Sequence, residues 1–247
     1  MTQDILTVMW KERKGLFRLQ GSRARTLLGL LVAVLMIAIG MPIQMGRDWV
    51  EDAWSLLESF VIPMMLVGIM IPESFAGERE RHTLETLLAS RLPDRAILFG
   101  KLALAVAYGW AITLLILLLS LIPVNALHWS GRIMVYEPDI ALANVVVSLL
   151  VSGLVASLGV LISLRSTTAQ GAQQMLMLLL MLPIVVLQIG PMLVLSVVPD
   201  GEAILRQWLS VDLTHIMLVL VGVLLIADAG LLLAAMARFQ RARLILD

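Results

Sequence analysis

The sequence contains no cysteine among its 247 residues, and only 15% of those residues are charged. Without cysteine, the chain cannot form disulfides, use a thiol nucleophile or bind a metal through thiolates. Its hydrophobic fraction of 60% and mean hydropathy of +0.96 lie far outside the composition of soluble domains, which are about 45–50% apolar. The scarcity of charge therefore indicates an integral membrane protein.

Motifs of nucleotide hydrolysis and of common hydrolases are also missing. The only Gly-Lys pair, Gly100-Lys101, has Arg95 where a phosphate-binding loop needs glycine and Leu102 where it needs serine or threonine. There is no His-Glu-x-x-His or Gly-x-Ser-x-Gly string, and the three histidines lie in different segments. We expect this chain not to be an enzyme and to have no catalytic residue, metal site or cofactor of its own.

Six apolar runs are long enough to cross a bilayer, which takes about 20 helical residues. Charged residues, prolines or both bound each run. The sequence therefore predicts an all-α polytopic membrane protein with a six-helix transmembrane domain over residues 26–247. The predicted spans are Thr26–Met45, Leu56–Phe75, Ala96–Ile122, Ile140–Leu164, Gln174–Val198 and Leu213–Arg238.

Residues 1–25 precede these runs and mix charged with apolar side chains. Apolar residues recur there at about helical spacing, and basic residues fill most of the opposite side, which is typical of an amphipathic helix in the membrane interface. A solvated basic tail is the alternative. The segment lacks the apolar core and cleavage site of a signal peptide, so we expect it to be retained. The apolar positions are Leu6, Met9, Trp10, Leu16 and Phe17.

The distribution of lysine and arginine predicts the orientation in the membrane. All but three of the 18 lie before the first span, between Glu73 and Lys101, at Arg165 or in the C-terminal tail. By the positive-inside rule, these regions and both termini are cytosolic. In the last outer connection, residues 200–211 predict a short amphipathic or re-entrant helix, with a plain loop as the alternative.

The longest strongly polar segment, Glu73–Lys101, lies between the second and third apolar runs. Residues Glu78–Ser90 within it predict a short cytosolic helix with three leucines on one side and charges over much of the rest. Pro93 ends this helix, and Asp94 is a good N-cap for the next span. The leucine side either packs on the membrane or on this chain's own helix ends, or it binds another protein.

Three strings in this segment carry a family resemblance. They are Glu73-x-x-x-Gly77-Glu78-Arg79-Glu80, then Thr83-Leu84-Glu85-x-Leu87-Leu88-Ala89-Ser90, and after a turn Ile97-Leu98-x-Gly100-Lys101. They closely resemble the second-to-third-helix loop of ABC-2 type permeases, the membrane subunits of a large class of ATP-binding-cassette exporters. The resemblance extends in outline to the whole chain. His82 departs from it, because many family members have glycine at that position.

The resemblance implies a partner and a mechanism. In the family this loop forms a coupling helix that docks into a separate ATPase subunit, which binds ATP and Mg²⁺. A second permease copy, or a paralogue, is expected to complete the translocation pathway, and no nucleic acid is expected to bind. By this resemblance the docking residues are Glu78, Arg79, Glu80, Arg81, Thr83, Leu84, Glu85, Leu87 and Leu88.

Asp228, in the sixth predicted span, is the clearly intramembrane acid, and Glu58 lies nearer the outer end of the second span. An ionisable residue in a membrane costs a few kcal/mol unless it is paired or hydrated, so each is a candidate functional site. The alternative for Asp228 is a hydrogen bond to a neighbouring helix or contact with an inner aqueous vestibule.

Together these features predict a multi-pass permease in the plasma membrane of a prokaryote, exporting an apolar or amphipathic substrate. Two other classes compete with it. One is a secondary transporter powered by an ion gradient through Asp228. The other is a membrane scaffold or assembly factor that binds a cytosolic protein through the leucine side.

Overall fold

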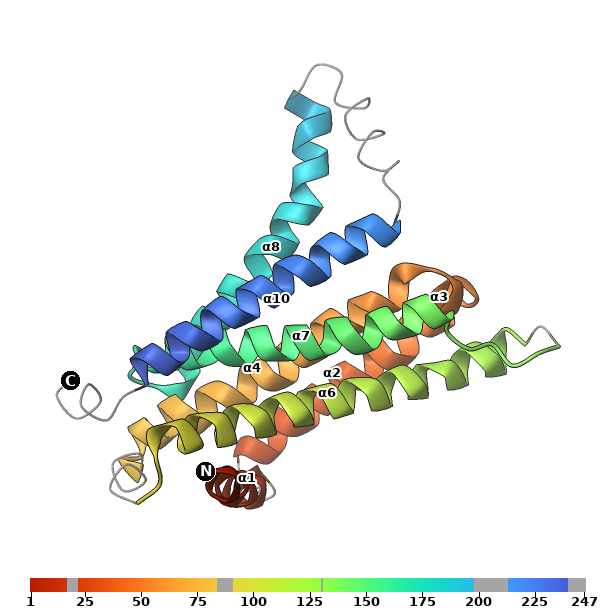
Figure 1. Cartoon of the computed structure of the whole chain (residues 1–247). Helices are drawn as coiled ribbons and strands as arrows, with labels where there is room; N and C mark the ends of the chain where they lie inside the picture. Colours follow the sequence, from red (N-terminus) through yellow and green to blue (C-terminus); the bar gives the residue numbers. More distant parts are fainter. Residues whose placement is uncertain (17–21, 84–90, 130, 198–212, 240–247) are drawn as a thin grey trace.

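The computed structural model describes residues 1–16, 22–83, 91–129, 131–197 and 213–239. These residues form helices and the turns between them, with no strand among them (Figure 1). The elements in chain order are α1 (Thr2–Leu16), α2 (Ser22–Met45), α3 (Asp48–Glu51), the 3-10 helix η1 (Ala53–Ser55), α4 (Leu56–Glu80), α6 (Asp94–Leu127), α7 (Pro138–Ser163), α8 (Ala169–Val197) and α10 (Leu213–Arg238). The expected all-α fold is confirmed for these residues.

Four helical stretches within the described residues are long and apolar enough to cross a membrane. They are Ala53–Glu80, Asp94–Leu127, Pro138–Ser163 and His215–Arg238. Helices α2 and α8 coincide with the first and fifth predicted runs. A multi-pass membrane protein is therefore confirmed, whereas the count of six spans stays a prediction.

Helix α4 lies at the centre of the bundle and packs against α6, α7 and α8. Val67 and Ile71 on α4 are fully buried. Glycines on the neighbouring helices allow this close approach, since a Cβ added at Gly109 would overlap Val67 and one at Gly159 would lie 2.8 Å from Ile71 Cγ2. The middle of α4 is therefore packed closely against α6 and α7.

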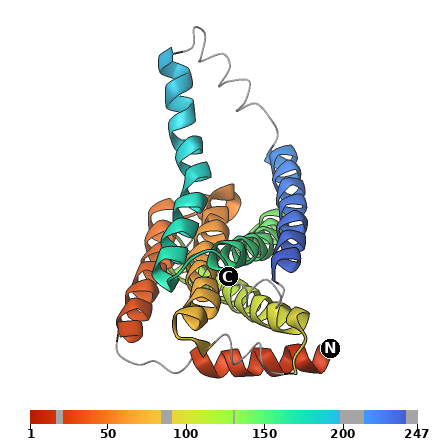
Figure 2. The same ribbon diagram turned by 90° about the vertical axis from the view of Figure 1, so that its left-hand side faces the viewer.

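Helix α1 crosses one end of the bundle at a steep angle to the other helices (Figures 1 and 2). It packs on α6, where Val8 is buried and a Cβ added at Gly100 would lie 2.7 Å from Val8 Cβ. Leu6 and Trp10 are exposed, and the Lys14 ammonium lies 3.6 Å from the Trp10 ring centre. We call this end of the bundle the α1 end and the opposite end the far end.

At the far end, side chains of α3 pack against the connection between α6 and α7 in a small cluster. Trp49 is buried, and its Nε1 donates to Ser120 Oγ at 3.4 Å and to the Tyr136 hydroxyl at 3.3 Å. The Glu137 backbone N–H donates to the Val50 carbonyl at 3.3 Å. These bonds hold α3 against the start of α7. The predicted short helix at residues 200–211 lies outside the described residues.

Helix α6 begins one residue away from the expected position. Pro93, with an extended backbone at φ −67° and ψ 144°, is the N-cap residue, and Asp94 is the first residue of the helix. The expectation that Asp94 caps the helix was therefore wrong by one position. Its carboxylate still lies in the first turn, where the helix dipole favours negative charge.

Helices α8 and α10 leave much of their apolar surface uncovered. The second half of α8 rises away from the other helices (Figures 1 and 2). In a bilayer such surfaces contact lipid or another transmembrane protein. The most exposed large side chains on the two helices include Met175, Leu178, Leu182, Leu218, Val219 and Ile226.

Candidate functional site

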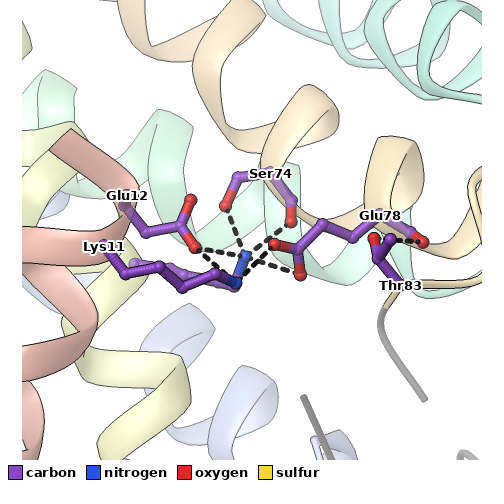
Figure 3. A network of polar contacts seen from close by, with 6 residues as sticks. Lys11, Glu12, Ser74, Glu78 and Thr83 are labelled. Carbon is purple, nitrogen blue, oxygen red and sulfur yellow. Dashed lines mark hydrogen bonds and ion pairs between the residues drawn. The ribbon is translucent and has the colours of Figure 1, made fainter. Parts of the chain in front are cut away.

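A buried lysine is the centre of the α1 end. Lys101 lies near the start of α6, and its side chain is 0% exposed. Its ammonium nitrogen lies 3.0 Å from Glu12 Oε1 and 2.9 Å from Glu78 Oε2. It also donates to the Ser74 carbonyl at 2.8 Å and to Ser74 Oγ at 3.0 Å (Figure 3). One side chain of α6 therefore joins α1 to α4.

A second lysine completes this group. Lys11 Nζ lies 3.0 Å from Glu78 Oε1 and 3.5 Å from Glu12 Oε1, so two ammonium groups and two carboxylates meet (Figure 3). Burial lowers the pKa of Lys11, but the carboxylates of Glu78 and Glu12 outweigh burial and hold the pKa above its ordinary value. We call Lys11, Glu12, Ser74, Glu78 and Lys101 the lysine cluster.

Pairing explains how Lys101 is accommodated. A buried ion loses several kcal/mol of hydration, and removing one partner of a buried pair typically costs about 3–5 kcal/mol. The formal charges of the two lysines and two glutamates cancel, and Ser74 supplies two acceptors to the ammonium of Lys101. The lysine cluster therefore holds α1, α4 and α6 in a single arrangement.

Two residues at the end of α4 contact the next pair of helices. Arg79 Nη1 donates to the Leu164 carbonyl at 2.9 Å, directly after α7, and Glu80 Oε2 accepts from the Ala169 backbone N–H at 3.1 Å, at the start of α8. A cation at a helix C-terminus and an anion at an N-terminus both complement the helix dipole. The last turn of α4 is thus also attached to the α7–α8 turn.

The end of α4 lies further along the chain than the sequence indicated. Residues Glu78–Glu80 form its last turn, so the predicted start of a separate short helix at Glu78 was wrong. Apolar burial and charged contacts extend α4 beyond the apolar run. Directly after it, His82 has a positive φ of 55°, a conformation that favours glycine. This is the position where the resembling family often has glycine.

The structure locates five of the nine predicted docking residues. Glu78 belongs to the lysine cluster, Arg79 and Glu80 hold the α7–α8 turn, and Arg81 Nη1 lies 3.0 Å from Glu73 Oε1. Thr83 Oγ1 donates to the Glu78 carbonyl at 3.2 Å. The other four lie outside the described residues: Leu84, Glu85, Leu87 and Leu88.

The residues missed by sequence reasoning are Lys11, Glu12, Ser74 and Lys101 as a group. One signal was present, because Lys101 lies inside the third apolar run, and a charge there needs a partner. Its partners, however, come from segments far away in the chain. Only the packing of α1 against α6 brings them together.

The two intramembrane acids lie on other elements. Glu58, in the first turn of α4, is fully buried, and neither of its carboxyl oxygens has a hydrogen-bond partner. Asp228 packs on α7 beside Gly153, and its Oδ2 would lie 3.2 Å from a Cβ added at that glycine. Its Oδ1 is buried and has no hydrogen-bond partner. Among the residues that the structure describes, no group of three potential ligands could hold a metal ion.

Comparison with protein families gives a match over most of the chain. Residues 59–232 match the family model described as ABC-2 family transporter protein. This range takes in most of α4, all of α6, α7 and α8, and α10 as far as Leu232. A search of curated proteins gives no match.

Proposed function

Since the chain belongs to the ABC-2 transporter family, we propose that it is the permease subunit of an ABC exporter, driven by a separate ATPase subunit that docks on residues 73–101. The α1 end is then the cytosolic end. Two permease copies, or this chain and a paralogue, enclose the translocation pathway. ATP and Mg²⁺ are bound by the ATPase and not by this chain.

The lysine cluster is the observation that supports this proposal most directly. Residues 81–93 follow α4, and the last turn of α4 is attached to α1 and α6 through Lys101 and to the α7–α8 turn through Arg79 and Glu80. A force on residues 81–93 is therefore transmitted to all of these elements together. Such attachment is what a mechanical input requires, since rigid-body movement depends on elements that move as one.

The coupling step follows from this arrangement. When two ATPase subunits close around ATP, they carry the docked segments with them, and each segment displaces its α4. Because α4 is packed closely against α6, α7 and α8, the displacement reaches the far end and opens the pathway outward. The scarcity of charge in the spans favours an apolar or amphipathic cargo. The exposed apolar surfaces of α8 and α10 are available to the second permease and to lipid.

Co-purification tests the ATPase partner. The double variant Leu84→Asp plus Leu87→Asp places two charges on the predicted docking side, and we expect it to lose an ATPase that co-purifies with the wild type. The matched control is Ile133→Asp plus Val135→Asp, which makes the same change at two exposed positions in the α6–α7 connection. Retention of the ATPase by the first variant, or its equal loss from the control, would overturn the docking proposal.

Asp228 keeps the ion-coupled transporter as a second candidate, because a buried carboxyl oxygen without a hydrogen-bond partner is unusual. If ion coupling drives transport, Asp228→Asn abolishes it while ATPase binding and hydrolysis persist. If ATP drives transport, the variant keeps ATP-dependent export in proteoliposomes. A complex that forms normally but moves no compound would instead favour a scaffold.

A further inference from the structure

Glu58 at the far end has an environment that the coupling mechanism does not explain. Its side chain is fully buried, and neither carboxyl oxygen has a hydrogen-bond partner. No ion pair to Glu58 occurs among the described residues, in contrast to Glu78 at the other end of the same helix. An ionised carboxylate in that position would be buried without compensation, which is strongly unfavourable.

The polar side chains around the start of α4 bond to one another. Asn144 on α7 donates through Nδ2 to Ser55 Oγ at 2.8 Å and accepts at Oδ1 from Ser59 Oγ at 2.8 Å. Ser55, Glu58 and Ser59 share a helix face because they are spaced at i, i+3 and i+4. All four side chains are buried. The seam between α4 and α7 therefore contains a polar group in which only Glu58 lacks a partner.

Tyr136, in the α6–α7 connection, is a titratable group that interacts electrostatically with Glu58. Burial raises the pKa of Tyr136 to about 12, so its hydroxyl carries no charge near neutral pH. That hydroxyl also contacts Ser120 Oγ at 2.6 Å and lies 3.0 Å from the Leu117 carbonyl. Neither positive charge nor a free donor is available to Glu58 from Tyr136.

Two kinds of cation can neutralise a buried carboxylate. A metal ion needs several oxygen ligands around it, but both Glu58 oxygens lie without polar contacts, and the nearby hydroxyl and amide groups are engaged with each other. A proton needs no coordination shell. It converts the carboxylate into a neutral acid that the apolar interior tolerates.

We propose that Glu58 is a proton-binding site, filled when the far ends of α4 and α7 are packed as in this structure and emptied when they separate and water reaches the carboxyl. The step is a simple acid dissociation, in which the O–H bond breaks and the proton passes to water. Glu58 is then a proton site distinct from Asp228, and its existence does not depend on ATPase docking.

The pH dependence of stability tests this site on the full-length chain in lipid nanodiscs. An unfolded glutamate loses its proton above about pH 4.3, whereas folded Glu58 keeps it, so the wild type loses stability as pH rises from that value. Glu58→Gln has the shape of the protonated acid and no proton to lose. We expect the unfolding equilibrium constants of wild type and Glu58→Gln to diverge by up to about tenfold per pH unit, in favour of the variant.

The matched control is Glu51→Gln, an exposed carboxyl near the same end, 43% exposed and 3.4 Å from Arg47. We expect its pH dependence to follow the wild type. Infrared spectroscopy supplies a second measurement on the folded protein. A carbonyl band of a protonated carboxyl, present near neutral pH in the wild type and missing from Glu58→Gln, is the expected result.

Three outcomes would overturn the proposal. The first is a parallel pH dependence of wild type and Glu58→Gln. The second is an infrared spectrum in which Glu58→Gln loses no protonated carboxyl band. The third is wild-type stability that rises with added Na⁺ at constant pH and loses this response in Glu58→Gln, which would assign the site to a metal cation.

Discussion

Helix α4 has a largely buried glutamate near each end, and the surroundings of the two glutamates differ. At the α1 end, Glu78 meets two lysines, and every charge of the lysine cluster has an opposite charge beside it. At the far end, Glu58 shares a helix face with neutral serines that bond to an asparagine, and no described residue forms an ion pair with it. The first end gains a fixed geometry at the cost of dehydrating Lys101 and much of Glu12 and Glu78, and the second keeps the contact between α4 and α7 neutral.

This difference indicates at which end of the bundle the helices can separate more easily. Breaking the lysine cluster leaves a buried charge without its partner, which is far more costly than breaking neutral hydrogen bonds. The far-end seam, in contrast, is held by two hydrogen bonds of Asn144 and by apolar packing. A permease that opens at one end while remaining attached at the other needs this asymmetry.

The largest effect expected is that of Lys101→Met. Methionine has nearly the shape of lysine but no charge, so Glu12 and Glu78 are left to share Lys11, and we expect a loss of about 3–5 kcal/mol in the free energy of unfolding. Chemical denaturation in detergent measures it. The control is Lys14→Met, an exposed lysine of α1 whose ammonium lies over the Trp10 ring, with an expected loss below about 1 kcal/mol.

A compensated variant sharpens this result. Combining Lys101→Met with Glu78→Gln removes one charge of each sign and leaves Lys11 beside Glu12. Replacing a buried pair as a whole is often nearly neutral, so the double variant should recover part of the lost stability. If it is less stable than Lys101→Met alone, pairing is not what holds the α1 end.

Gly100→Ala is expected to have the next largest effect. The added methyl would lie 2.7 Å from Val8 Cβ, and it would push α1 away from α6 at a cost of about 1–3 kcal/mol. Adding Val8→Ala should restore much of that loss. Gly230→Ala is the control, because nothing lies within 4 Å of its added Cβ. If Gly230→Ala is as costly, close packing of α1 does not explain the loss.

At the far end, Asn144→Ala should cost less than Lys101→Met. It removes one hydrogen bond from α7 to η1 and one from α7 to α4, and interhelical bonds in membranes are worth about 0.6 kcal/mol on average, so we expect a loss of about 1–2 kcal/mol. Thermal unfolding measures it against Ser148→Ala, whose hydroxyl bonds only to carbonyls of its own helix. A loss as large as that of Lys101→Met would remove the contrast between the two ends.

The smallest effect should come from Glu80→Gln. The amide keeps an acceptor for the Ala169 N–H, so only the charge at the start of α8 is lost, at about 0.3–1 kcal/mol. Since this pair is exposed, we expect the loss to shrink at high salt. An unchanged loss at high salt would argue against an electrostatic contact.

The sequence predicted the helices well because apolar runs are local features. Helix α10 begins at Leu213 and ends at Arg238 as predicted, and α4 begins at Leu56. The end of α4 was missed because Glu78 and Arg79 are charged and lie beyond the apolar run, so they were assigned to the start of a separate short helix. Their partners lie in α1, in α6 and directly after α7. Sequence spacing carries no information on such contacts.

The candidate sites also differ in how much of them the sequence could predict. Glu58 and Asp228 were identifiable because an acid in an apolar run is conspicuous in any sequence. The serines near Glu58 were a weaker indication of a polar site. Ser55 lies three residues before Glu58 and Ser59 directly after it, so all three fall on one side of a helix. The role of Asn144 depends on the packing of α4 against α7, which composition and periodicity do not determine.

The lysine cluster also sets an order of events during synthesis. The ribosome makes α1, which carries Glu12, before α4 and α6, and Lys101 is made last of the five residues that meet there. Until the start of α6 is inserted, α1 has no buried ammonium to hold it and no Gly100 surface for Val8. Helix α1 is therefore made before α4 and α6, yet it reaches its final position only after the start of α6 has been inserted.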